Sequence, residues 1–470
     1  MALKATLYPY QTEGVQWMLE RETTYSGGIN ADEVGLGKTL MTIATIIKNP
    51  KPKTLILAPK SLVPQWEKEM AKFSTIKPYV NELPKDKESF VVIASHSKIV
   101  KRKAKENETE YHDIQWDRVV IDEAHVIKNN TSKINKSARS LPSKIRWALT
   151  ATPVMNNMAE FVNMMQWIGV EKTSCIQKKL EVTHTYILRR TKEDVAKIDD
   201  RLELPKLDIQ IKEVPFKSEE EIALYEQQWK DSRDIIKKMK KSEYLQNNAL
   251  EALEQLLRMR QISIHPQIYN TGMAKKRKES PEPWNHGSSK MNALVELLKD
   301  HQEKSLVFCH FIEEIDLYTQ AIEDAGFKTV RLDGSMDLET RQNMVHTFNS
   351  DFEVKVFLIQ IHTGGVGYNL QIASRVYITE PTWNPSIEYQ AIGRAHRTGQ
   401  KKPVQVVKLI STHPELRKPT VEQYILALHD KKNALVAEIL NDPRIAEVEK
   451  GAKARKVGQH ITFSDIAKMF

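Results

Sequence analysis

Short apolar runs alternate with helical patterns along the first part of the chain, up to about residue 190. The runs are Thr54–Ala58, Phe90–Ala94, Val119–Ile121 and Trp147–Leu149. Each run is continuously apolar, which is typical of a strand in a parallel sheet covered on both faces. Polar residues or a turn follow each run, where an α/β fold places its ligand-facing edge. This part of the chain is therefore predicted to form one α/β domain.

The middle of the chain has a different pattern, and the first pattern returns after it. Lys217–Gln261 is long, charged and helical in pattern, and Gly272–Ser289 is rich in glycine, proline and charge, which indicates a linker or an exposed excursion. After Lys290, further apolar runs predict strands at Leu306–Cys309, Val330–Leu332, Val356–Ile359, Val376–Thr379 and Val404–Leu409. The predicted fold class is α/β, with two parallel-sheet domains in tandem and a mainly helical insertion between them. The predicted domains are 1–197, 198–288 (helical insertion and basic linker), 289–430 and 431–470 (C-terminal helix and tail).

Composition narrows the class of protein. A chain of 470 residues is too long for one typical core, and 40% hydrophobic with 28% charged residues fits a globular protein. No apolar stretch approaches the ~20 residues of a membrane helix, and the first residues lack the apolar region of a secretory signal. Cys175 and Cys309 are far apart, so we expect no structural zinc, no disulfide framework and an intracellular location. The net charge of +9 favours an anionic partner, though on charge alone the odds are about even.

A glycine-bearing loop follows the first predicted strand. Gly28–Ala31 reads as that strand, DEVGLGKT occupies Asp32–Thr39, and a helix with one apolar face begins near Lys38. This strand–loop–helix order is the context of a phosphate-binding loop. The strict pattern GxxxxGK[ST] is not met, because Asp32 stands where it requires glycine.

The loop predicts a nucleotide site with its metal. Gly35 and Gly37 would let backbone N–H groups close around phosphate oxygens, and the helix N-terminus adds partial positive charge. Lys38 would reach the β- and γ-phosphates of ATP, and the Thr39 hydroxyl would bind Mg²⁺. The predicted nucleotide-binding residues of the loop are Asp32, Glu33, Val34, Gly35, Leu36, Gly37, Lys38 and Thr39.

Two adjacent carboxylates end another buried-looking strand. Asp122 would hold Mg²⁺, and Glu123 would polarise the water that attacks the γ-phosphate. His125 is placed to sense the state of the nucleotide. Thr150 and Thr152, after the next apolar run, would link the acid pair to movements between domains.

The second domain offers cations for the same reaction. Arg394 and Arg397 are three residues apart, which predicts that they lie on one side of a helix. Guanidinium groups aimed at the γ-phosphate would stabilise the transition state and make hydrolysis depend on domain closure, with Gln390 as a coupling residue. In isolation, a solvated arginine face explains the pair as well. Gly367 would bring backbone close to phosphate or ribose, although a tight turn would look the same.

Taken in order, these motifs resemble those of the Swi/Snf family of superfamily-two ATPases, the helicase-like DNA translocases. The resemblance covers roughly residues 5 to 430. The motif sequences are most similar to the fork-remodelling and transcription-termination branch, but we expect no RING finger, because the chain has only two cysteines. The resemblance makes Gln11 an adenine-reading glutamine and Asp32–Glu33 the expected start of the phosphate loop. The quoted motifs are YPYQ, GGINADEVGLGKT, LILAPKSLVPQWEKE, VVIDEAHVIKN, LTATPVMNN, ILRRTKEDV, HP, RLDGSMDLETRQNMVHTFNS, GGVGYNL and EYQAIGRAHRTGQKKPVQVVKLI.

The resemblance implies two RecA-like cores, ATP with Mg²⁺, and double-stranded DNA bound with little sequence preference. Chromatin, polymerase or repair factors would be further partners, and the location would be a eukaryotic nucleus, a cytoplasm or a viral replication site. Lys275–Lys278 is either a DNA contact, a nuclear-localisation signal or a solvated loop. The alternatives are a strand-separating helicase, a non-enzymatic DNA-binding scaffold and a nucleosome remodeller. The candidate DNA contacts are Lys60, Ser97, Thr152, Lys275, Lys276, Arg277, Lys278 and Thr363.

Overall fold

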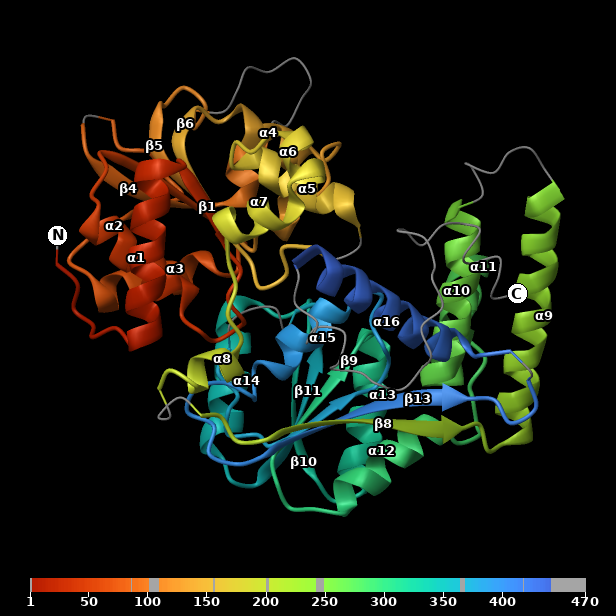
Figure 1. Ribbon diagram of the computed structural model, residues 1–470. Coiled ribbons are helices and arrows are strands. Elements are labelled where there is room, and N and C mark those ends of the chain that lie inside the picture. Colours follow the sequence, from red (N-terminus) through yellow and green to blue (C-terminus); the bar gives the residue numbers. More distant parts are fainter. Residues whose placement is uncertain are drawn as a thin grey trace. The chain divides into compact units, whose positions relative to one another are not determined.

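The chain folds into two compact units. The computed structural model describes residues 2–85, 87–100, 110–154, 157–199, 203–241, 249–363, 368–416 and 418–440. Within these ranges, the first unit comprises the residues up to 204 together with 432–440, and the second comprises 205–431. Each unit is built on a parallel sheet with helices on its faces (Figure 1).

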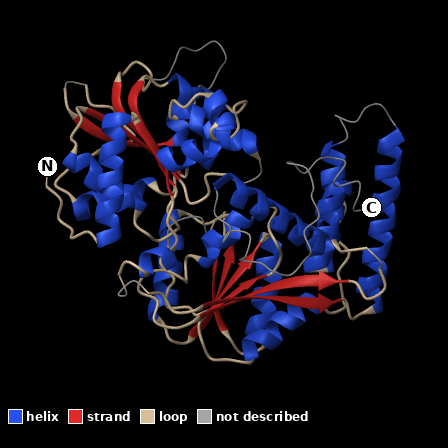
Figure 2. Ribbon diagram, in the orientation of Figure 1, coloured by secondary structure: helices blue, strands red, loops and turns tan. Residues whose placement is uncertain are grey.

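The first unit contains a seven-stranded sheet with the order β3-β4-β2-β5-β6-β1-β7, in which every neighbouring pair is parallel (Figure 2). Its central strands are buried along their length because helices cover both faces, as their continuous apolar runs predict. The strands are β1 (Gly27–Asn30), β2 (Lys53–Ala58), β3 (Tyr79–Val80), β4 (Phe90–Ser95), β5 (Trp116–Asp122), β6 (Ser143–Leu149) and β7 (Ile187–Leu188).

The helices of the first unit connect these strands. They are α1 (Pro9–Thr24), α2 (Lys38–Lys48), α3 (Val63–Phe73), α4 (Lys133–Ser140), α5 (Met158–Trp167), α6 (Lys172–Gln177), α7 (Lys179–Tyr186) and α8 (Lys192–Ala196), with 3₁₀ turns η1 (His96–Ile99) and η2 (Ala124–Ile127). A buried ion pair fixes α1 against the sheet, since Arg118 of β5 donates from Nε to Glu22 Oε1 at 2.6 Å. Trp147 Nε1 donates to the same carboxylate at 2.9 Å, so the charge of Glu22 is compensated inside the core.

The second unit contains a six-stranded parallel sheet with the order β10-β11-β9-β12-β13-β8. The strands are β8 (Leu207–Pro215), β9 (Ser305–Cys309), β10 (Lys328–Leu332), β11 (Val354–Gln360), β12 (Arg375–Ile378) and β13 (Val404–Thr412). The helices are α9 (Glu219–Lys241), α10 (Ala249–Ile264), α11 (Pro266–Arg277), α12 (Ser289–Lys299), α13 (Ile312–Asp324), α14 (Leu338–Ser350), α15 (Pro385–Ile392) and the first part of α16 (Val421–Leu440), whose residues from 432 on belong to the first unit. Of the helices in the described part of the chain, none is both long and apolar enough to cross a membrane.

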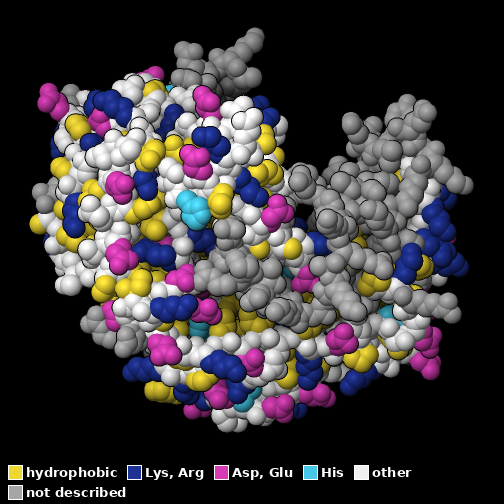
Figure 3. All heavy atoms as spheres, in the orientation of Figure 1, with side chains coloured by type: hydrophobic (Ala, Val, Ile, Leu, Met, Phe, Trp, Pro, Cys, Tyr) yellow, Lys and Arg dark blue, Asp and Glu magenta, His cyan; other side chains and the backbone are white. Residues whose placement is uncertain are grey.

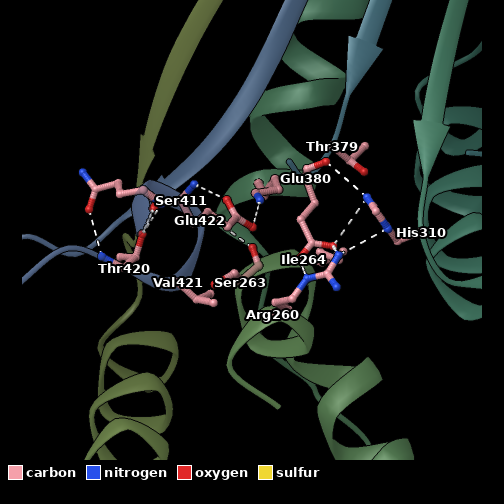
Figure 4. A network of polar contacts seen from close by, with 12 residues as sticks. Arg260, Ser263, Ile264, His310, Thr379, Glu380, Ser411, Thr420, Val421 and Glu422 are labelled. Carbon is pink, nitrogen blue, oxygen red and sulfur yellow. Dashed lines mark hydrogen bonds and ion pairs between the residues drawn. The ribbon is translucent and has the colours of Figure 1, made fainter. Parts of the chain in front are cut away.

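A buried polar network joins α10 to the second sheet (Figure 4). Arg260 donates to the carboxylate of Glu380, just after β12, with Nη2 2.8 Å from Oε2. Ser411 of β13 donates from its backbone N–H to Glu422 at 2.7 Å and from its hydroxyl to the carbonyl of Ser263 at 2.8 Å. These bonds satisfy charges that would be costly to bury alone, so they hold the helical insertion to its sheet.

The predicted fold class is confirmed, with two parallel α/β sheets in tandem, and the apolar runs lie in strands. The structure adds detail to the middle segment, which was predicted to be mainly helical. It begins with strand β8, which pairs with β13 and belongs to the second sheet, and its helices follow. Gly272–Ser289 includes the end of α11, which continues to Arg277, and residues 275–283 are exposed. The division between 430 and 431 falls inside α16.

Candidate nucleotide-binding site

The loop between β1 and α2 has the backbone geometry of a phosphate cradle. Gly35 and Gly37 have φ values of 95° and 81°, which favour glycine. A Cβ on Gly37 would lie 2.5 Å from Gln11 Nε2, so the position also lacks room for a side chain. Lys38 Nζ donates to the carbonyls of Asp32 at 2.6 Å and Glu33 at 3.3 Å. Burial lowers the pKa of Lys38, and nearby carboxylates, Asp32 first among them, oppose that shift.

The start of α1 is attached to this loop. Gln11 is buried; its Nε2 donates to the Leu36 carbonyl at 3.4 Å, and its Oε1 accepts from the backbone N–H of Tyr8 at 3.1 Å. The Tyr10 hydroxyl donates to the same Leu36 carbonyl at 3.0 Å. The structure therefore brings Gln11 and the phosphate loop together, and adenine recognition by Gln11 stays a prediction.

The two acids of the loop engage cations from a distant part of the chain. Asp32 is fully buried and accepts hydrogen bonds from the backbone and guanidinium of Arg190. Glu33 lies 3.2 Å from Lys192 Nζ. The sequence pattern includes Asp32, Glu33 and the half-buried Val34 among nucleotide-binding residues, and this role stays a prediction. The signal that could have identified the pairing is the cationic run after β7.

The acid pair lies where predicted, at the carboxyl end of β5. Asp122 Oδ2 accepts from Trp66 Nε1 at 2.7 Å, and Oδ1 accepts from the backbone N–H of Glu123 at 2.9 Å. Glu123 has a left-handed backbone conformation with φ 48°, which is unusual for a non-glycine residue. Burial, followed by the charge of Glu123, raises the pKa of Asp122 to about 6.

The residues present fit Mg²⁺. Magnesium prefers carboxylate and hydroxyl oxygens and keeps several waters. A divalent cation at Asp122 would relieve the repulsion from Glu123 that raises the pKa of Asp122. Asp122 and the half-buried Thr39 would hold the ion, which would neutralise phosphate charge when bound.

Two histidines contact the acid pair. His125 Nδ1 lies 3.2 Å from Glu123 Oε2, consistent with its predicted sensing role, which stays a prediction. His96 was not singled out from the sequence; its Nε2 lies 2.9 Å from the Asp122 carbonyl. Burial lowers the pKa of His96 to about 4, so its imidazole is neutral and Nε2–H donates to that carbonyl. His96 thus fixes the end of β5.

The threonines after β6 adjoin both motifs. The backbone N–H of Thr150 donates to the Asn30 carbonyl at 3.1 Å, which places it beside the start of the phosphate loop. Thr150 Oγ1 accepts from the backbone N–H of Thr152 at 3.1 Å. Among the described residues, the buried Thr152 hydroxyl has no hydrogen-bond partner, which is costly unless a conformational change supplies one. Their coupling role stays a prediction.

Lys60 and Ser97 follow β2 and β4 at the same carboxyl edge of the sheet. Both are exposed, and Ser97 Oγ lies 2.9 Å from Ser95 Oγ. In the second unit, Thr363 follows β11 and its hydroxyl donates to the Gln360 carbonyl at 2.7 Å. Their predicted contact with DNA remains a prediction, and Gly367 lies outside the described residues.

The arginines of the second unit do not share a helix face, and that prediction is wrong. Helix α15, which carries Gln390, ends at Ile392, and Arg394 and Arg397 lie in the turns that follow. The turns are held by Gln400, whose Nε2 donates to the carbonyls of Gln371, Ala373 and Ala395 at 2.8–3.1 Å. Arg394 is buried and Arg397 is half-buried. Their contribution to the ATP site stays a prediction.

Two family models match the chain, one in each unit. An SNF2-related domain matches residues 10–179, and a helicase conserved C-terminal domain matches residues 289–399. Together with the phosphate loop, the acid pair and the tandem parallel sheets, these matches define a superfamily-two, helicase-like ATPase. Within that class, the chain belongs to the Snf2 family.

Relatives come from bacteria, eukaryotes and a virus. The chain is 31% identical to an uncharacterized ATP-dependent helicase of Mycoplasma genitalium (92% of this chain, 42% of that protein) and 29% identical to the ISWI chromatin-remodeling complex ATPase ISW1 of Saccharomyces cerevisiae (95% and 42%). It is 28% identical to a probable global transactivator of Orgyia pseudotsugata multicapsid polyhedrosis virus (93% and 91%). The chain thus spans less than half of the first two proteins. A solved SWI2/SNF2 ATPase core of Sulfolobus solfataricus in complex with dsDNA is 26% identical, with a TM-score of 0.41 (95% and 96%).

Proposed function

We propose that this chain is a DNA-dependent ATPase that moves along double-stranded DNA. The observation that carries the proposal is the arrangement at the carboxyl edge of the first sheet. There the phosphate loop follows β1, the threonine pair follows β6, and the acid pair follows β5, on three adjoining strands. This order supports the proposal, because it brings the phosphate loop, the threonine pair and the acid pair side by side.

Each residue has a distinct part in the proposed reaction. Lys38 would neutralise the β- and γ-phosphates, and Glu123 would orient the attacking water from its left-handed backbone position. His125, in contact with Glu123, would transmit the loss of the γ-phosphate. Arg394 and Arg397 would add positive charge in the transition state, and hydrolysis would then require both units.

Double-stranded DNA is the proposed partner, bound through its phosphates with little sequence preference. In the second unit, Lys and Arg side chains gather along α9 (Figure 3). The basic ends of α9 and α11 both lie near the first turns of α10, since Ile236 and Ala252 belong to one buried apolar cluster and Lys276 Nζ lies 2.8 Å from Glu254. Exposed cations of these helix ends include Lys237, Lys238, Lys275, Lys276, Arg277 and Lys278.

The test is the ATPase rate without DNA, with single-stranded DNA and with duplex DNA. Duplex DNA is expected to raise the rate most, and Glu123→Gln to lower it by at least about a hundredfold while the variant still binds ATP. Glu67→Gln, an exposed acid of α3, is the matched control and should leave the rate unchanged. If duplex DNA has no effect and Glu123→Gln retains the rate, the chain is a non-enzymatic scaffold instead.

Strand separation and translocation give different products. A translocase displaces a third strand from a triplex without unwinding the duplex, whereas a helicase releases a labelled strand. We expect triplex displacement alone. Adding nucleosomes to the ATPase assay tests the remaining alternative, because a remodeller would be stimulated by nucleosomes more than by the same length of free DNA.

A further inference from the structure

A short cationic segment after β7 is bound to the phosphate loop at several points. We name residues 189–192 the clasp segment. Arg189 Nη1 lies 3.3 Å from the Ala151 carbonyl, beside the threonine pair. Lys192 donates its backbone N–H to Glu33 Oε2 at 2.9 Å, and its ammonium lies 3.2 Å from Glu33 Oε1. The clasp segment therefore contacts two motifs that precede it in the sequence. Ala151 lies 38 positions before Arg189, and Glu33 lies 159 positions before Lys192.

Arg190 makes the most extensive contact. Its backbone N–H and Nε donate to Asp32 Oδ1 at 2.9 and 3.1 Å, and Nη2 donates to Asp32 Oδ2. The guanidinium also lies 5.3 Å from the centre of the Tyr10 ring, and Nη1 donates to the Tyr10 carbonyl. One side chain thus joins the phosphate loop to the start of α1, where Gln11 lies.

The surrounding residues leave a space of the right size for this guanidinium. A Cβ on Gly14 of α1 would lie 2.7 Å from Arg190 Nη2 and 2.7 Å from Met41 Sδ. The backbone N–H of Glu33 donates to the Arg190 carbonyl at 3.0 Å, so main chain and side chain are both paired. A bidentate, stacked guanidinium in such a space is not replaceable by an ammonium.

Two carboxylates beside a triphosphate would repel it, since like charges at short range raise the cost of binding. We propose that Arg190, assisted by Lys192, is a positioning residue for ATP: it neutralises Asp32 and holds the phosphate loop against the start of α1. The proposal rests on the proposed ATP-binding function. It explains how Asp32 is tolerated where a strict phosphate loop has glycine.

The test measures MgADP affinity by calorimetry and KM and kcat for ATP in the full chain. Arg190→Met is expected to weaken MgADP binding and raise KM by about tenfold, with kcat changed by less than about threefold, because ground-state binding is lost. Adding Asp32→Asn should restore part of the affinity, since the unpaired carboxylate is then removed. Arg118→Met is the matched control: it breaks another buried arginine–carboxylate pair of the same unit, away from the loop.

Equal losses of MgADP affinity in Arg190→Met and Arg118→Met would overturn the proposal, because general destabilisation would then explain both. Affinity within about twofold of the unchanged protein in Arg190→Met would overturn it too. Where Arg190→Met does not fold, Arg190→Lys decides, with the same direction of change expected. A chain that binds MgADP but hydrolyses no ATP would refute the proposed function. The MgADP affinities of the Arg190 variants could still be compared, so the two failures are distinguishable.

Discussion

Glu123 combines a strained backbone with a carboxylate needed for the proposed reaction. Its φ of 48° places a non-glycine residue in the left-handed region, between β5 and η2. Such conformations cost about 1–3 kcal/mol and persist where the surroundings impose them. Here the surroundings are the hydrogen bond from the Glu123 N–H to Asp122 Oδ1 and the contact with His125. The strain positions the Glu123 carboxylate beyond the end of the strand.

Replacing Glu123 by glycine separates strain from chemistry. Glu123→Gln keeps the left-handed backbone strain, whereas Glu123→Gly removes it, so the glycine variant is expected to be more stable than the glutamine variant by about 1 kcal/mol. Both should lose ATP hydrolysis. Urea unfolding followed by circular dichroism measures the difference, and equal midpoints for the two variants would contradict the strain argument.

Glu314 in the second unit predicts a dependence of stability on pH. It is fully buried at the start of α13, where it accepts from the backbone N–H groups of His310 and Phe311 at 2.7 and 3.2 Å. Burial raises its pKa from 4.5 to about 7. Because the folded state therefore binds a proton that the unfolded chain releases, stability falls as pH rises from about 4.5 to 7.

Glu314→Gln should remove this dependence. The variant is expected to gain stability at pH 8, by about 3 kcal/mol at most, and little at pH 4. Urea midpoints measured across pH 4–8 test it, with the exposed Glu353→Gln as the control. A constant offset between Glu314→Gln and the unchanged protein over that range would show that the carboxyl does not titrate as its burial implies.

At the scale of single residues, the sequence predicted those whose partners lie nearby in the chain. Lys38 and Asp122 follow from local patterns, a glycine-bearing loop and a strand end. Trp66 and Arg190 were not identified as site residues, because their partners are 56 and 158 positions away. Only the folded sheet brings such residues together, and no periodicity along the chain records it.

Elements were predicted where burial is continuous. The central strands of both sheets are buried along their length, so their apolar runs stand out. Strand β8 was missed because it lies at a sheet edge, where most of its residues are exposed or half-buried and several are charged. Helix α11 was partly read as a linker because the glycine and charges near its end outweigh a short apolar pattern.

The contacts at the end of helix α11 predict which cations of Lys275–Lys278 bind DNA. All four cations are exposed, but Lys276 Nζ is held by both oxygens of Glu254, at 2.8 and 2.9 Å, whereas Lys275, Arg277 and Lys278 form no ion pair within the part of the chain that the structure describes. Replacing Lys275, Arg277 and Lys278 together by glutamine is expected to reduce the slope of log K against log salt by about two to three, and Lys276→Gln by less than one. Fluorescence anisotropy with a labelled duplex measures both slopes.

Cations at the end of a helix also complement its dipole, so stability is measured alongside binding. A loss of stability in the triple variant with an unchanged salt slope would assign these residues to the helix alone. Equal slopes for the triple variant and Lys276→Gln would contradict the distinction drawn from Glu254.

At the scale of the whole molecule, the predicted chemistry is divided between two folded units. The first holds the phosphate loop and the acid pair, and the second holds Arg394 and Arg397 in turns braced by Gln400. If hydrolysis needs both units, substitutions in the second should lower kcat without weakening nucleotide binding by the first. This separation of effects distinguishes a motor from an ATPase complete within one unit.

Arg397→Ala is the most informative variant for testing whether hydrolysis needs the second unit. Arg397 is half-buried, whereas Arg394 is buried and the loss of Arg394 would disturb the core. We expect kcat to fall by about a thousandfold, because a guanidinium that meets the γ-phosphate acts mainly in the transition state. MgADP affinity and duplex affinity should stay within about twofold, and Lys401→Ala, an exposed cation of the same turn region, should change none of the three. An unchanged kcat in Arg397→Ala would mean that the first unit hydrolyses ATP without this arginine. A parallel loss of MgADP affinity would mean that Arg397 binds nucleotide in the ground state and adds nothing specific to the transition state.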